Sequence, residues 1–174
     1  MPARPARLVV ASTLALAALL AGCGGAPPVS ADEFTDLVAG TSGDHEPPSS
    51  AEELASWSDV VVRGTVEDVT PGRVWASSED DPARSETVTV VVAVDEVEQG
   101  ALPAGHDGHL YLEASFHGGA EAGVDAVPRG LRVQVYAWLL PDETGEPILD
   151  PAAGRPAGQH LHVVTTPEGW VVDP

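Results

Sequence analysis

Residues 86–100, which read ETVTVVVAVDEVEQG, constrain the fold strongly because their apolar residues recur with a period of two. Side chains two residues apart point to the same side of a strand. One side of this stretch is all valine and the other is mixed: Val88, Val90, Val92 and Val94 on the first, Thr87, Thr89, Val91 and Ala93 on the second. β-branched side chains also favour strands over helices. The stretch therefore predicts a strand with one face in an apolar core.

Further stretches carry strand patterns of the same kind: residues 59–69, 109–116, 131–140, 160–166 and 170–173. Gly64, inside the first of them, predicts a bulge or sharp coil of the kind that curves a small barrel. Val74 and Trp75 extend this first strand into the polar connection that follows it. The sequence TPEG before Trp170 predicts a turn that joins the last two strands in a terminal hairpin.

One helix is predicted, at the start of the folded part. Ser50 and Glu53 fit a capping box, and Leu54 and Trp57 follow as an apolar stripe. No segment between the strands shows a helical period. The predicted fold class is therefore all-β: a small closed, OB-like barrel of five to six strands with a short N-terminal helix, with a β-sandwich as the alternative.

The N-terminus carries the pattern of an export signal. Arg4 and Arg7 precede an apolar run from Leu8 to Leu20, which is the layout of a secretion leader. The run is too short to span a bilayer comfortably, since a spanning helix needs about 20 apolar residues. The leader ends at Cys23, the only cysteine of the chain, so the chain cannot form an internal disulfide.

The residues at this junction, Leu20, Ala21, Gly22 and Cys23, resemble the lipobox of bacterial lipoproteins. The resemblance implies that the leader is cut before Cys23, that the Cys23 thiol carries a diacylglycerol, and that the new amine is a further site of acylation. Two or three acyl chains anchor a protein stably. The resemblance thus implies an extracytoplasmic protein whose lipid on Cys23 holds it to the outer face of the cell membrane.

Composition divides the chain further. Residues 1–22 are the predicted signal peptide, residues 23–50 are a lipidated N-terminus and flexible linker rich in Pro, Gly and acidic residues, and residues 51–174 are the barrel domain. The formal net charge is −19, and loss of Arg4 and Arg7 with the leader gives −21. Such a charge repels nucleic acid. Part of the acidic bias is typical of GC-rich coding sequences, as in actinobacteria.

A second resemblance concerns residues 51–140. The stretches WSDVVVRGTVEDV, TVTVVVAVDEVEQG, LYLEA and PRGLRVQVYAWL are similar in order to strands of netrin-like and metalloproteinase-inhibitor-like OB-fold modules. The similarity implies the fold. It does not imply inhibition, because this chain lacks the N-terminal Cys-x-Cys with which that family chelates the protease zinc.

Two histidine pairs are candidate metal ligands. His160 and His162 share one face of a strand, while His106 and His109 flank a turn. Histidine pairs on neighbouring elements bind zinc or copper, so a metal-binding lipoprotein is the alternative function. Exposed polar positions beside the barrel rim are the other interpretation of these residues.

The remaining patterns indicate binding rather than catalysis. The sequence shows no nucleophile beside an identifiable base and no glycine loop of the phosphate-binding kind. Tyr136 and Trp138 share a strand face and either fill the core or form a binding platform. We therefore expect a non-enzymatic, surface-displayed lipoprotein that engages a protein or another envelope component.

Overall fold

The computed structural model describes residues 46–172 apart from 117, 142–144 and 146, so the leader and the lipobox lie outside the described residues. Its elements follow one another as α2 (Ala51–Trp57), β1 (Val60–Trp75), β2 (Ser85–Gly100), β3 (His109–Ser115), α3 (Gly119–Ala126), β4 (Arg132–Leu139), β5 (Leu161–Val164), a 3₁₀ turn (Pro167–Gly169) and β6 (Trp170–Val172). Within the described ranges, none of the helices combines the length and apolarity that a membrane crossing requires.

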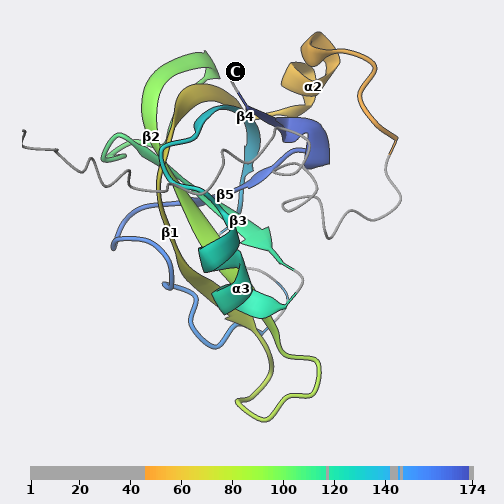
Figure 1. Ribbon diagram of the computed structural model, residues 1–174, viewed down its shortest axis with the longest axis vertical. Helices are drawn as coiled ribbons and strands as arrows, with labels where there is room; N and C mark the ends of the chain where they lie inside the picture. The colour runs from red at the N-terminus through yellow and green to blue at the C-terminus, as the bar shows by residue number, and fades with distance from the viewer. Residues whose placement is uncertain (1–45, 117, 142–144, 146, 173–174) are drawn as a thin grey trace, which may run out of the picture.

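The strands close into a barrel. β1 pairs with β2 and β2 with β3, both antiparallel; β3 pairs with β5 in parallel, β5 with β4, and β4 returns to β1. This ring confirms the OB-like barrel and not the sandwich. Figure 1 shows the long β1–β2 hairpin running the length of the domain, with α2 beside one end and α3 lying against it nearer the other.

Gly64 explains how the 16-residue strand β1 curves. The register between β1 and β2 shifts between Arg63 and Gly64, which confirms the predicted irregularity. A Cβ at Gly64 would lie 2.2 Å from the carbonyl oxygen of Ala93, closer than any real side chain allows. The two backbones therefore approach closely only because position 64 carries no side chain.

The barrel core consists of the inward-facing residues that the period of two predicts. Each strand of the ring contributes apolar side chains to one cluster, and Trp170 of β6 closes it. The main buried members are Val60, Val62, Val66, Val69, Val88, Val90, Val92, Leu110, Leu112, Val133, Val135 and Ala137. Burial of β-branched and leucine side chains is the main favourable contribution to such a core.

The helix α2 begins where the sequence predicts. The Ser50 hydroxyl accepts a hydrogen bond from the Glu53 amide at 3.2 Å, while the Glu53 carboxylate accepts from the amide of Ser49 at 2.7 Å and not from that of Ser50. Leu54 then packs with Val61 and Tyr136 in a small second cluster on the outside of the barrel. This cluster fixes α2 against β1 and β4.

The absence of a helix between the strands was a wrong prediction, because α3 connects β3 to β4. Its sequence, GAEAGVDA, has a single large apolar side chain, so its buried face consists mainly of alanine and glycine and is hard to recognise in the sequence. The helix docks through its small residues instead. A Cβ at Gly123 would lie 2.7 Å from the Phe116 ring and 2.8 Å from Val88.

The predicted terminal hairpin is also wrong. The segment before Trp170 turns, as a 3₁₀ helix, but β5 and β6 do not pair with each other. Both pair with β4, β5 along residues 137–139 and β6 along residues 133–135. Strand β4 is longer than β5, so β5 pairs with only part of its edge. β6 pairs with another part of the same edge, where its backbone groups gain their hydrogen bonds.

Candidate binding face on the barrel

The outer face of β1, β2 and β3 carries a buried ion pair. Arg73 of β1 donates from Nε to Oε2 of Glu113 at 2.6 Å and from Nη2 to Oε1 at 2.9 Å. Arg73 is 1 % exposed and Glu113 9 %. The Arg73 guanidinium also lies 4.8 Å from the centre of the Trp75 ring. A buried charge requires such a partner because its desolvation is costly.

Threonines continue this polar face across the strands. Thr89 of β2 is opposite Thr70 on one side and Glu113 on the other. The Thr87 hydroxyl lies 3.0 Å from the Arg73 carbonyl oxygen, to which it donates. Thr89 is fully buried, and within the described residues its hydroxyl has no hydrogen-bond partner. Buried hydroxyls usually have one, which makes Thr89 an unusual position.

Residues 147–159, which we call the strap, belong to the connection between β4 and β5 and lie over this face. Gly154 marks the closest approach: its φ is +80°, and a Cβ there would lie 2.0 Å from the Thr89 hydroxyl oxygen and 3.3 Å from Gly72. Only glycine therefore fits at this position. The strap passes directly over the row formed by Thr70 and Thr89.

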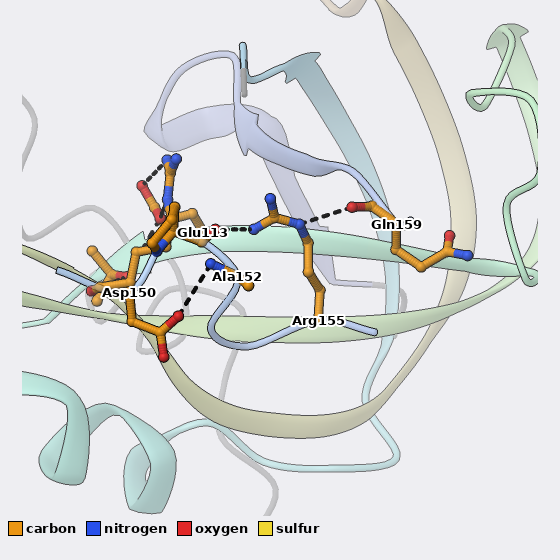
Figure 2. A network of polar contacts seen from close by, with 8 residues as sticks. Glu113, Asp150, Ala152, Arg155 and Gln159 are labelled. Atoms are coloured by element: carbon orange, nitrogen blue, oxygen red, sulfur yellow. Dashed lines mark hydrogen bonds and ion pairs between the residues drawn. The ribbon is translucent and has the colours of Figure 1, made fainter. Parts of the chain in front are cut away.

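The strap is organised by its own contacts. Arg155 donates from Nε to the carbonyl of Gln159 at 2.8 Å and from Nη1 to that of Pro151 at 2.9 Å, and the Ala152 amide donates to the Asp150 carboxylate at 3.2 Å. Figure 2 shows the Arg155 side chain between Ala152 and Gln159, with its hydrogen bonds drawn as dashed lines. The segment is thus a folded unit resting on the barrel.

A shallow groove runs beside the strap. It is lined by Thr70 and Glu67 of β1, His109 and Tyr111 of β3, and Gly154 and Arg155 of the strap. The groove offers hydroxyl, carboxylate, imidazole and guanidinium groups within one concavity. A concave site with a few converging polar groups is the usual form of a ligand site.

His109 is held between two carboxylates at this groove. Its Nε2 lies 2.8 Å from Glu67 and its Nδ1 3.1 Å from Asp107, while the Tyr111 hydroxyl donates to the other Asp107 oxygen at 2.7 Å. Partial burial opposes the charged ring, but the hydrogen bonds and charges of Glu67 and Asp107 outweigh it and raise the His109 pKa. The arrangement favours an imidazolium that ties β1 to β3.

The second histidine pair lies elsewhere. His162 is buried, with Leu112 and Leu139 as its strand partners, and its Nδ1 has no hydrogen-bond partner within the described residues. Burial and the neighbouring His160 lower the His162 pKa to about 4. This histidine is therefore neutral at ordinary pH.

The structure does not gather the four predicted metal ligands. His106 lies in an exposed turn, where its Nδ1 accepts from the Gly108 amide, and His109 binds carboxylates. Across residues 46–172, apart from the undescribed positions, no group of three or more His, Cys, Asp or Glu side chains is placed to hold a metal ion. Zinc and copper thus have no ligand set in this part of the chain.

Tyr136 and Trp138 on β4 take different roles, one filling an apolar cluster and the other lying exposed at the surface. Tyr136 is buried beneath α2, whereas Trp138 is 44 % exposed. The Trp138 indole nitrogen donates to the Trp57 carbonyl at 2.7 Å, and Trp57 is itself 41 % exposed. Tyr136 therefore fixes the helix, and the two tryptophans form an exposed aromatic corner.

Comparison of the chain with protein-family models, with curated proteins and with solved structures finds no match. We therefore identify the candidate face from its geometry alone. Sequence reasoning missed Arg73 and Glu113, the two charged residues at its centre. The available signal was weak: Glu113 alternates with the core residues Leu110 and Leu112, and Arg73 immediately precedes the predicted end of the first strand.

Proposed function

We propose that this chain is a lipid-anchored, extracytoplasmic binding protein without enzymatic activity. The observation that carries the proposal is the run Leu20, Ala21, Gly22 and Cys23 at the end of a short apolar leader. A thiol at this position accepts a diacylglycerol, and acyl chains hold a protein at a membrane surface. The mature chain, with a formal net charge of −21 once Arg4 and Arg7 are lost from −19, would gain no help from anionic lipids, so the lipid is the anchoring element.

The binding part of the proposal concerns the barrel. OB-like barrels bind ligands on the face of their second and third strands, between the connections that follow the first and the fourth strands. In this chain that face carries Thr89, Glu113 and Tyr111, and the groove beside the strap opens onto it. A protein or envelope component with polar groups is the partner that such a surface suits.

Membrane fractionation tests the anchor. The Cys23→Ala variant should leave the membrane fraction for the soluble envelope or the medium, because no thiol remains to receive the lipid. Gly25→Ala is the matched control: it changes the same short segment, keeps Leu20 to Cys23 intact, and should stay with the membrane. Retention of the Cys23→Ala protein in the membrane fraction at the size of the mature chain would contradict the proposal.

A further inference from the structure

The strap lies over a buried face without being buried itself. Arg73, Thr87, Thr89 and Glu113 are all at most 9 % exposed. In contrast, every described residue from 147 to 159 is exposed or only partly buried. The strap therefore contributes few apolar contacts of its own, and segments of this kind open at lower free energy than the core of a protein.

Few hydrogen bonds hold the strap to the barrel. At its start the Ala76 amide donates to the Pro147 carbonyl at 3.2 Å and the Leu149 amide to the Val74 carbonyl at 2.9 Å. Over Thr89 the strap is held by a long contact, in which the Thr70 hydroxyl lies 3.5 Å from the Gly154 carbonyl. At its other end Gln159 donates from Nε2 to the Gly105 carbonyl at 3.2 Å. Among the described contacts, the attachment is thus strong near the tip of the β1–β2 hairpin and weak over Thr89.

The polar groups under the strap are held by contacts within the barrel. The Arg73–Glu113 pair joins β1 to β3 across β2, and the Thr87 hydroxyl donates to the backbone of β1, so all four groups belong to the barrel. The Thr89 hydroxyl makes no bond to the strap or to any other described residue. A preformed polar face with an unused hydroxyl is able to take a ligand in place of the strap.

We propose that the strap is a displaceable lid over the binding face of the barrel, which lifts away at Gly154 and releases the Leu149 amide from the Val74 carbonyl as it opens. Opening exposes the hydroxyls of Thr70 and Thr89 and the Arg73–Glu113 pair. Because that ion pair carries no net charge, the exposed face suits a neutral polar ligand. The ligand role rests on the proposed binding function, whereas the opening of the strap is a property of the domain alone.

Amide hydrogen exchange of the full mature chain tests the lid. In the wild type the Leu149 amide should exchange through a local opening, whose free energy changes little with low concentrations of urea because little surface is exposed. The amides of the β1–β4 ladder should exchange only through global unfolding, whose free energy falls steeply with urea. This comparison needs no variant. Equal opening free energies and equal urea dependence at Leu149 and in the ladder would show a strap that is a fixed part of the barrel, and would overturn the proposal.

Two glycine variants sharpen the test. Gly154→Ala and Gly158→Ala both place a side chain at positive φ, +80° and +84°. Only the first meets an atom of the barrel, since no atom of the described residues lies within 4 Å of a Cβ at position 158. Gly154→Ala should speed exchange at Leu149 about tenfold to a hundredfold, the equivalent of a typical overpacking cost, with the β1–β4 ladder unchanged. Gly158→Ala should lack this effect.

The outcomes separate the lid from the anchor. Equal acceleration at Leu149 in both variants, or acceleration of the ladder together with the strap in Gly154→Ala, would overturn the lid. The exchange pattern does not depend on Cys23, so an unmodified thiol would contradict the proposed function and leave the lid intact.

Discussion

Arg73 and Glu113, 40 residues apart in the chain, form a bidentate ion pair across the outer face of the barrel. The pair spans β2, whose Thr87 hydroxyl lies 3.5 Å from the same Glu113 oxygen that accepts from Arg73 Nε. Both charges are buried. Replacement of such a pair by apolar residues is often neutral, but removal of one partner leaves an uncompensated charge. This asymmetry gives the first prediction.

Glu113→Gln should lower the free energy of unfolding by about 3–5 kcal/mol, since Arg73 then remains charged and buried. The double variant Arg73→Met with Glu113→Leu should lose less than Glu113→Gln alone. Glu96→Gln, at an exposed position of β2, is the control and should change stability by less than about 0.5 kcal/mol. Urea denaturation measures all three; a double variant that loses as much stability as Glu113→Gln, or more, would contradict the account.

The pKa of the His109 imidazole should lie above its ordinary value because Glu67 and Asp107 stabilise the charged ring. A raised pKa in the folded state stabilises the protein fully below the unfolded value of about 6.5, and this contribution is lost as the pH rises through the folded pKa. NMR titration of the ring measures it directly. Glu67→Gln should lower the His109 pKa, and an unchanged pKa in that variant would refute the assignment.

His162 acts with the opposite sign. Its pKa is lowered to about 4 by burial, so between about pH 6.5 and 4 the unfolded chain binds a proton that the folded chain does not. Stability should therefore fall on acidification, by about 2 kcal/mol between pH 6.5 and 5. Urea unfolding of His162→Leu should lack this contribution. If wild type and variant lose stability in parallel over that range, the buried neutral imidazole is not the cause.

Gly64→Ala should destabilise the barrel, because the added Cβ would lie 2.2 Å from the backbone oxygen of Ala93, which has little freedom to move. Overpacking of this kind costs about 1–3 kcal/mol. Gly145→Ala is the matched control, since no atom of the described residues lies within 4 Å of a Cβ at that position. Thermal unfolding compares the two, and equal melting temperatures for both variants would exclude the close approach of β1 and β2.

The fold could be predicted from the sequence where burial alone decides it. The valine periodicity of β2 and the glycine at position 64 gave the strand, its core face and its bulge, because a two-residue period has only one structural meaning. The helix α3 could not be found this way. Its docking depends on Gly123 fitting against Phe116 and Val88, and an absent side chain leaves no periodic signal.

The candidate face was harder to predict than the fold. Arg73 and Glu113 are charged residues of ordinary appearance, and only the barrel closure and the strap make them buried partners. The histidines show the opposite difficulty. A pattern reveals which of them share a strand, but the partners of His109 come from β1 and from the preceding turn, as Glu67 and Asp107.

The mass of the intact protein extracted from membranes tests the central claim most directly. We predict a chain that begins at Cys23 and is heavier than residues 23–174 by a diacylglycerol, with or without a further acyl chain on the new amine. A chain that retains the leader, or one that begins at Cys23 or beyond it without lipid, would contradict the account.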